Sequence, residues 1–310
     1  MNFKKIVSIV VAVAMMLSGC SGSSSQGTDK TPQVQSESAS QLNESAPNSE
    51  IALDSSDMSA VSDVVTVAEQ VIFDDENIKI TAKSLETDGF MGAELKLLIE
   101  NNSEKRVIVQ SQNENVNDVM LTAMFSTDID AGKKANDSMT FMRRELEAAN
   151  ITTIKDIELN FVILDPDSYR TLYTSETISV STTANSDYVQ TYDDNGSLML
   201  EQDGLRIVAQ RLNSNDSFWG SEMFLFVENN CGEDVVIQVD NVSVNGFMVT
   251  PMFSCYVLSD KKAFDEITFL ERELTENNIS DIEELELEIL ILSPENYTTI
   301  FASDKIKISF

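Results

Sequence analysis

The residues best able to do chemistry in this chain are its carboxylates, because the 310 residues include 52 Asp and Glu and no histidine. The missing histidine excludes Ser-His-Asp and Cys-His nucleophile activation, imidazole metal ligands and histidine proton shuttles. Among so many acids, carboxylate pairs with the spacing used for glycoside hydrolysis arise by chance, so they favour no enzyme. We therefore expect a protein that is not an enzyme, and a hydrolase is the least favoured alternative.

The densest acidic run, Glu283–Glu288, is the candidate cation site, since carboxylate oxygens suit Ca²⁺. On a β-strand, however, Glu284, Glu286 and Glu288 lie along one face, about 6–7 Å apart. A calcium site gathers about six to eight oxygens around one point, and no segment has the spacing of an EF-hand loop. We expect a solvated strand face with no metal and no cofactor; weak Ca²⁺ binding is the alternative.

Two lysine pairs, Lys133-Lys134 and Lys261-Lys262, are positive spots in a chain whose net charge is −31. They could contact anionic polymers of a cell envelope, or they could be charged hairpin turns that keep a sheet edge soluble. We favour the second interpretation. The strong negative charge argues against nucleic acid as a partner, because phosphate binding needs clustered Lys and Arg.

Phe218 and Trp219 lie together in a polar loop, and Trp219 is the only tryptophan. An exposed aromatic loop tip would be a binding hot spot for a protein or glycan partner. A single tryptophan is more often a core residue or a contact between domains, and this interpretation is favoured.

The sequence from about residue 70 onward consists of two tandem copies of one repeat. Lys133-Lys134-Ala135 returns as Lys261-Lys262-Ala263, and Arg144-Glu145-Leu146 returns as Arg272-Glu273-Leu274. Both matches have the same offset, 261 − 133 = 272 − 144 = 128, which holds without a gap from Ile99 to Val180. A period of this length indicates a duplicated domain rather than a short solenoid repeat.

Each copy reads as mostly β. Short apolar or alternating segments predict strands at Ile78–Leu85, Leu95–Ile99, Val107–Val109, Val119–Phe125, Asp156–Leu164 and Ile178–Val180, with counterparts at Leu205–Leu212, Met223–Val227, Val235–Val239, Phe247–Phe253, Glu284–Leu292 and Ile306–Ile308. Phe141–Ile151 and Phe269–Ile279 should begin as strands and pass into a short helix where the chain crosses between sheets. The pattern predicts an all-β protein with one short helix per repeat, built as two tandem immunoglobulin-like β-sandwiches. A different β-sandwich or a small barrel is the alternative.

The last strand provides a check on this topology. It carries Lys305 and Lys307 at alternate positions, and an immunoglobulin-like sandwich places it antiparallel beside Glu284–Leu292. The lysines should therefore face the glutamates, because opposite charges on adjacent strands stabilise a sheet. The first copy has Thr177 and Ser179 at the lysine positions and fewer acids on the facing strand.

Cys231 and Cys255 occur only in the second copy, where the first has Ser103 and Thr127. Both should lie toward the same end of the sandwich. Two interpretations stay open: a disulfide bridge closing the intervening loop, and two buried free thiols.

The N-terminus has the features of an export signal. Lys4 and Lys5 precede an apolar stretch, Ile6–Leu17, that is too short to remain in a bilayer as a spanning helix. Leu17-Ser18-Gly19-Cys20 follows directly and resembles the lipobox of bacterial lipoproteins. That resemblance implies cleavage before Cys20 and attachment of diacylglycerol and a fatty acyl chain such as palmitate to this cysteine.

The predicted organisation has five parts. They are a signal peptide (1–19), a lipidated, disordered, Ser-rich tether (20–69), a first immunoglobulin-like domain (70–182), a linker (183–194) and a second such domain (195–310). The tether lacks aromatic residues from 21 to about 68, a composition that cannot bury enough apolar surface to fold.

The whole chain resembles tethered lipoproteins of Gram-positive bacteria that carry tandem immunoglobulin-like domains. The resemblance lies in Ile99-Glu100-Asn101-Asn102-Ser103, taken as a hairpin, and in Gly132-Lys133-Lys134. It implies a place on the extracytoplasmic face of the cell membrane, anchored by lipid, and it implies no activity. Separately, we expect a monomer. We expect a non-enzymatic binding, adhesion or spacer module with an unknown envelope protein or glycan as partner. The alternatives are a ligand-binding receptor for a transporter and, less favoured, an envelope hydrolase.

Overall fold

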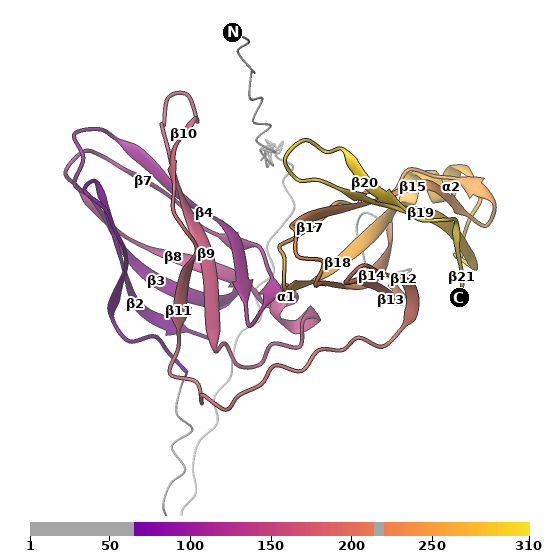
Figure 1. Cartoon of the computed structure of the whole chain (residues 1–310), viewed down its shortest axis with the longest axis horizontal. Helices are drawn as coiled ribbons and strands as arrows, with labels where there is room; N and C mark the ends of the chain where they lie inside the picture. The colour runs from indigo at the N-terminus through magenta and orange to yellow at the C-terminus, as the bar shows by residue number, and fades with distance from the viewer. Residues whose placement is uncertain (1–64, 214–219) are drawn as a thin grey trace, which may run out of the picture. The chain divides into compact units, whose positions relative to one another are not determined.

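The computed structural model describes residues 65–213 and 220–310, and the fold follows the duplication (Figure 1). The first copy contains β1 (Gln70–Asp74), β2 (Ile78–Glu86), β3 (Gly92–Asn101), β4 (Val107–Val116), β5 (Val119–Met120), β6 (Ala123–Met124), β7 (Ser126–Ile129), β8 (Lys134–Met142), α1 (Arg143–Ala148), β9 (Asp156–Leu164), β10 (Thr171–Thr174) and β11 (Ile178–Ser181). The second contains β12 (Ser197–Gln202), β13 (Leu205–Asn213), β14 (Gly220–Asn229), β15 (Val235–Val244), β16 (Phe247–Met248), β17 (Cys255–Val257), β18 (Lys261–Leu270), α2 (Glu271–Glu276), β19 (Glu284–Leu292), β20 (Thr299–Ala302) and β21 (Ile306–Ser309).

Each copy packs two sheets face to face around its own apolar core. In the first copy, β1-β2-β3-β8-β6 face a sheet built on β4 and β9; in the second, β12-β13-β14-β18 face β16-β15-β19-β20. Leu95, Leu97 and Phe161 are fully buried in the first core, as Leu285 and Leu287 are in the second. The expected all-β architecture of two tandem immunoglobulin-like sandwiches is confirmed.

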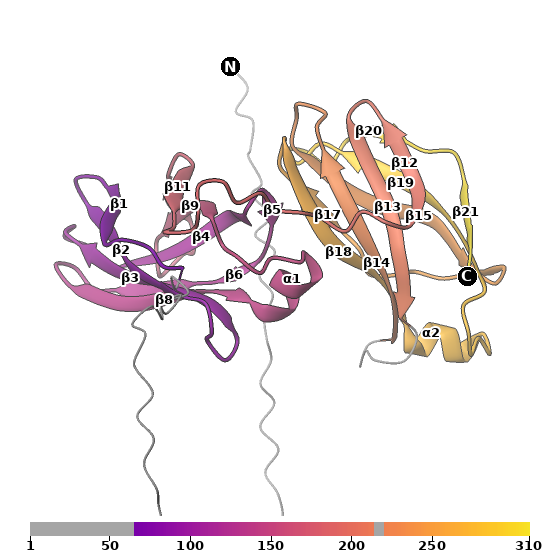
Figure 2. The same ribbon diagram turned by 90° about the horizontal axis from the view of Figure 1, so that it is seen from below.

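The two copies are joined by a strand pair. β5 of the first copy lies parallel to the start of β18, with Val119 opposite Lys262 and Met120 opposite Ala263. This pairing merges one sheet from each copy into a single ten-stranded sheet of order β10-β9-β4-β5-β18-β14-β13-β12, with β11 also paired with β9 and β7 with β4. Figure 2 shows β13, β14 and β18 side by side in the part of this sheet that belongs to the second copy.

The helices stand where the sequence predicted them. α1 follows β8 and precedes β9 in the opposite sheet, and α2 has the same place between β18 and β19. Asn150 and Asn278 end these helices with φ of 54° and 55°, the left-handed conformation that asparagine tolerates better than most residues.

Three strand expectations were wrong. The segment after Asn101 is not a hairpin, because β3 and β4 belong to opposite sheets. The carboxamide of Asn101, fully buried, donates to the carbonyls of Lys105 (2.8 Å) and Ile129 (3.0 Å), which fixes this crossing. The stretch Val119–Phe125 is divided between β5 and β6, which lie in different sheets. Its counterpart keeps only β16 as a strand.

The lysine pairs are also not hairpin turns. Lys134 begins β8 and Lys261 begins β18, two of the longer strands of the fold. The polar first half of β8 was missed because exposed and half-buried positions alternate there without a run of apolar residues.

The pairing of the last strand is confirmed. β19 lies antiparallel to β21, with Glu286 opposite Lys307. The Lys307 ammonium is 2.6 Å from the Glu284 carboxylate, and that of Lys305 is 3.2 Å from Glu286. Glu288, further along the strand, instead accepts a hydrogen bond from Asn241.

No helix in the part of the chain that the structure describes is long and apolar enough to cross a membrane. The predicted anchor residue Cys20, the leader and the tether up to residue 64 lie outside the described residues, as do Phe218 and Trp219.

Candidate ligand groove between the repeats

The contact between the repeats begins at a two-residue hairpin. Asn117 and Asp118 connect β4 to β5 and have φ of 51° and 66°, the positive values that type I′ turns require. The turn presents the Asp118 carbonyl, which accepts a hydrogen bond from the Lys262 backbone N–H at 2.9 Å. The parallel pairing of β5 with β18 starts from this bond.

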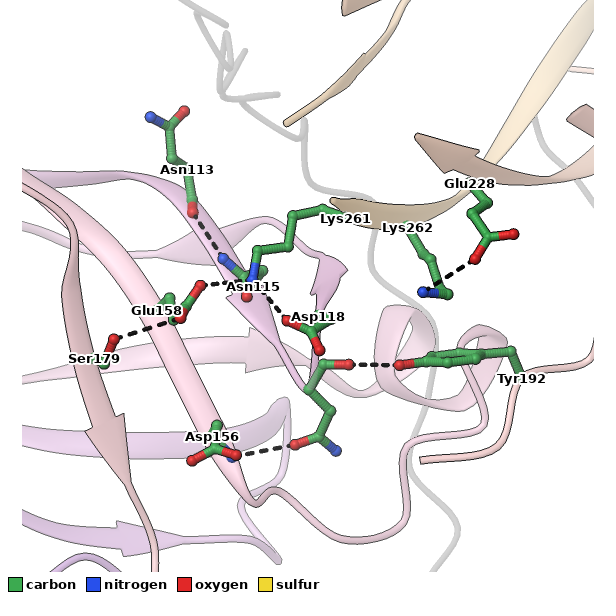
Figure 3. Close-up of polar contacts among 11 residues, drawn as sticks. Asn113, Asn115, Asp118, Asp156, Glu158, Ser179, Tyr192, Glu228, Lys261 and Lys262 are labelled. Atoms are coloured by element: carbon green, nitrogen blue, oxygen red, sulfur yellow. Dashed lines mark hydrogen bonds and ion pairs between the residues drawn. The ribbon is translucent and has the colours of Figure 1, made fainter. Parts of the chain in front are cut away.

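Lys261 crosses from the second repeat into the first (Figure 3). Its ammonium is 2.6 Å from the Asp118 carboxylate and 2.7 Å from that of Glu158 on β9, and its side chain is 14% exposed. Burial by itself lowers the pKa of Lys261, but the hydrogen bonds to the two carboxylates outweigh it and raise this pKa. Lys261 is therefore a charged link between the two sandwiches.

Lys262 lies on the other side of the same strand end. Its ammonium is 3.3 Å from Glu228 and 4.8 Å from the ring centre of Tyr192. The Tyr192 hydroxyl donates to the Asn117 carbonyl at 2.8 Å, and burial raises the Tyr192 pKa to about 12. The predicted partner-contact residues Lys261 and Lys262 thus contact the other repeat of the same chain.

The segment between the repeats packs on the first one. Gln190 accepts a hydrogen bond from the Asn117 side chain and donates to the Asn150 carbonyl. The Lys155 ammonium donates to the carbonyls of Ser186 and Tyr188. These bonds cover the end of the first sandwich beside β5.

A groove of about 630 Å³ lies next to the strand pair and takes its walls from both repeats. The side chains that give it its chemistry are Glu114, Arg144, Glu145, Phe224, Asp265 and Glu266. Arg144 of the first repeat forms an ion pair with Glu266 of the second. Arg211 stacks on Phe224, with its guanidinium carbon 4.0 Å from the ring centre.

Glu114 is the most unusual of these residues. It lies in a bulge of β4, between Gln112 and Asn115, next to Asn113 with φ of 59°, and bulges re-aim side chains. Only 7% of Glu114 is exposed, and its counterpart in the second repeat is the core residue Val242. Burial raises the Glu114 pKa, partly offset by the Ser111 hydroxyl. A carboxyl therefore replaces a core valine where the chain faces the groove.

Asp265 is the second buried carboxyl of the groove. Burial raises its pKa to about 6, opposed by its contacts with the Glu266 N–H and the Cys255 thiol. The first repeat has Thr127 and Asp137 in the same places, and there the hydroxyl donates to the carboxylate. Burial, together with Asp265, raises the pKa of the Cys255 thiol, so this sulfur stays protonated and is a poor nucleophile.

Glu145 completes the acidic wall from α1. Its carboxylate accepts a 2.6 Å hydrogen bond from the Thr122 N–H, and burial raises its pKa. The groove thus combines four carboxyls with two arginines, one of which is already paired. Such a lining favours a ligand with a positively charged group, because field lines concentrate in a partly desolvated cleft.

The remaining predicted site residues lie elsewhere. Lys133 and Lys134 are exposed at the start of β8, and Lys134 pairs with Glu100. Among the residues described, no three His, Cys, Asp or Glu side chains are arranged to hold a metal ion.

Cys231 and Cys255 are both free thiols, so the disulfide alternative is not formed in this structure. Cys255 pairs with Ile237 inside the sheet, whereas Cys231 lies in the turn before β15, and its thiol points to the Glu233 carbonyl. Two strand positions therefore separate Cys255 from the end of the sheet where Cys231 lies.

Sequence reasoning missed the groove. The available signal was the difference between the copies, since Glu114 aligns with Val242 and Thr127 with Cys255. Where one copy of a duplication has a charged residue and the other has an apolar residue at the equivalent position, the two side chains have different surroundings. Such positions indicate the surfaces at which the copies differ.

No protein-family model matches the chain, and no curated protein matches it. Similar solved structures include the YadV chaperone, which is 13% identical over 76% of this chain and 100% of that chain, with a TM-score of 0.24. They also include the Salmonella enterica SafA pilin in complex with the SafB chaperone, at 12% identity, 77% and 98% coverage and a TM-score of 0.22. The E. coli chaperone DraB is 10% identical over 70% and 88%, with a TM-score of 0.20.

Proposed function

We propose that the protein is a membrane-anchored extracytoplasmic lipoprotein whose two repeats form a non-enzymatic binding module, with the inter-repeat groove as its ligand site. The observation that carries the proposal is Glu114, a buried carboxyl facing the groove at a position where the other repeat has a core valine. A buried carboxyl without an ion-pair partner costs stability, so its presence here points to a role other than folding.

The chemistry of the groove supports binding rather than catalysis. Its thiol, Cys255, has a raised pKa and no histidine beside it, so the groove lacks an activated nucleophile. Its acids favour an ammonium or guanidinium group on the ligand, and the apolar rings of Phe224 and Phe264 would pack against the ligand's carbon atoms. Basic segments of envelope proteins and small organic cations both have this chemistry.

The lipid anchor is supported by the lipobox ending in Cys20. Two or more acyl chains on one cysteine give stable membrane attachment. The acidic body is repelled by anionic lipid headgroups, so the groove would face the space outside the membrane rather than the bilayer.

A test compares the wild type with Glu114→Val, the substitution that the second repeat already carries. A lysine-rich peptide and a glutamate-rich peptide of the same length are titrated by calorimetry. We expect binding of the lysine-rich peptide only, and at least a tenfold loss in Glu114→Val. Glu288→Gln, which lies outside the groove, is the matched control and should bind as the wild type does. Equal binding by all three proteins would remove the groove from the proposal.

A second candidate function is a ligand receptor for a transporter, favoured by the aromatic residues Phe224, Tyr256 and Phe264 in the groove walls. Native mass spectrometry of the protein after incubation with envelope extract separates the candidates. A bound mass of a few hundred daltons supports the receptor, and a bound polypeptide supports the adhesion module.

A further inference from the structure

The two repeats are connected by the pairing of β5 with the start of β18, which we call the joint. The second repeat carries a copy of the β5 side of this joint, and no described strand occupies it. β16 (Phe247–Met248) is the counterpart of β5 (Val119–Met120), since 247 − 119 = 128. β5 pairs with β4 on one side and with β18 on the other, but β16 pairs only with β15 among the described strands. Val119 is fully buried, whereas Phe247 is 49% and Met248 66% exposed.

The surface beside β16 is vacant in the same way. In the first repeat, Gln190 and Tyr192 cover the strand end around Asn117. In the second repeat, a hollow of about 410 Å³ is lined by the equivalent Asn245, together with Phe247, Asn278 and Glu283. No segment within residues 65–213 and 220–310 covers this hollow.

A matching edge exists at the other end of the repeat pair. Lys133-Lys134-Ala135, at the start of β8, is identical to the Lys261-Lys262-Ala263 that pairs with β5. β8 binds β3 along one side, but on its other side it binds β6 only at Thr140 and Phe141. Lys133 and Lys134 are exposed. The backbone edge that precedes Thr140 is therefore open, and it has the same sequence as the edge already used within the chain.

We propose that β16 binds the start of β8 from a second copy of this chain, so that copies associate head to tail through the geometry that joins the two repeats. In this contact the Lys134 N–H donates to the Gly246 carbonyl, as Lys262 donates to Asp118. Lys133 lies toward Glu286, the counterpart of Glu158, and shares this carboxylate with Lys305 and Lys307 of the other copy. Because the two edges are on different repeats, the contact does not close on itself, and repeated addition gives an open chain of copies.

The intermolecular contact is weaker than the one within the chain. Gly246 replaces Asp118, Asn136 replaces Phe264 and Ser138 replaces Glu266, so two charged contacts and one aromatic contact are lost. The net charge of −31 also makes copies repel each other. Association should therefore require a high local concentration and should increase when salt screens the repulsion.

The experiment places a photo-crosslinking benzoylphenylalanine at position 248 of the full chain in the cells that produce it. We expect adducts of two and more copies, and mass spectrometry should locate the second site within residues 133–139. Val71, which is 48% exposed and lies on β1 at the opposite edge of the first repeat's five-stranded sheet, is the control position and should give no such adduct. Adducts only with another protein, or none, would overturn the proposal.

A second measurement separates specific contact from chance proximity on a membrane. Lys133→Glu combined with Lys134→Glu should reduce the adduct at position 248 at least fivefold, because both exposed lysines belong to the proposed edge. Lys79→Glu combined with Lys83→Glu gives the same change in net charge away from that edge and should leave the adduct unchanged. A similar loss in both double variants would show that only net charge matters and would contradict the proposed edge.

Discussion

Lys261 and Glu158 form an ion pair at 2.7 Å although they belong to different repeats. The counterpart of Glu158 is Glu286, which is paired within its own repeat by Lys305 and Lys307. In the first repeat those lysine positions hold Thr177 and Ser179, which leaves Glu158 available to a lysine from elsewhere. The same glutamate position therefore forms a cross-strand pair in the second copy and a link between repeats in the first.

Replacing Lys261 should loosen this link. We expect Lys261→Ala to destabilise the protein by about 1–2 kcal/mol, because Glu158 and Asp118 lose a partly buried partner. Hydrogen exchange should become faster at the Lys262 N–H and in β5 than in either core. Lys133→Ala, the matching change in the first repeat, should alter stability by less than about 0.5 kcal/mol. Equal effects of the two variants would contradict the role of Lys261 in the joint.

The β19–β21 ladder should behave as a set of ion pairs and not as a calcium site. Changing Lys305 to Thr and Lys307 to Ser gives the second repeat the residues of the first and leaves Glu284 and Glu286 unpaired. We expect a lower melting temperature, with a difference from the wild type that shrinks in high salt. Added calcium should leave the wild-type melting temperature unchanged. A calcium-dependent rise that Glu286→Gln abolishes would restore the calcium alternative.

Asp265 should make stability depend on pH. Burial raises its pKa from 3.8 to about 6, so the folded protein holds this proton more tightly than the unfolded chain. The stability from this group is complete below about pH 4 and is lost as the pH rises through 6. Asp265→Asn should therefore gain on the order of 2–3 kcal/mol relative to the wild type between pH 4 and pH 8. Asp203→Asn, at an exposed acid, should follow the wild-type curve in urea unfolding.

The anchor can be tested at the lipobox. Cys20→Ala should leave the protein without lipid and block cleavage of the leader by the lipoprotein peptidase. Partitioning into detergent should then differ from that of the wild type. A variant that loses its leader and still partitions like the wild type would show that Cys20 is not the anchor.

The predicted tether, residues 20–69, can be tested by proteolysis. Limited proteolysis should release a fragment that begins between about residue 50 and the start of β1 at Gln70, because an unfolded segment is cut faster than a packed domain. Protection of the chain before residue 50 would show instead that this region packs on the repeats.

The alternation of polar and apolar residues along single strands made much of the fold predictable from the sequence. β9 and β19 have the expected bounds, Asp156–Leu164 and Glu284–Leu292, because the first six residues of each strand alternate between polar and apolar and so admit one register. The Lys307–Glu284 contact followed from the same alternation and from the order of strands in an immunoglobulin-like sandwich.

The groove and the joint were not predictable in this way. They depend on β5, a strand of two residues, which is too short to have a sequence period. In the sequence, nothing distinguishes Glu114 from an ordinary surface glutamate. Its burial follows from the bulge of β4, which has no sequence pattern of its own. The burial of Lys261 likewise depends on Asp118 and Glu158, which are more than 100 residues away in the chain.

The β5–β18 pairing also has a mechanical consequence. Only two residue pairs join the two halves of the ten-stranded sheet, whereas β14 and β18 are joined along ten. A force between the proposed lipid anchor and the second repeat would act across this junction, and this short ladder has the fewest hydrogen bonds to resist it. The junction should open before either sandwich does, lengthening the molecule while both cores stay folded, and it should re-form when the tension ends.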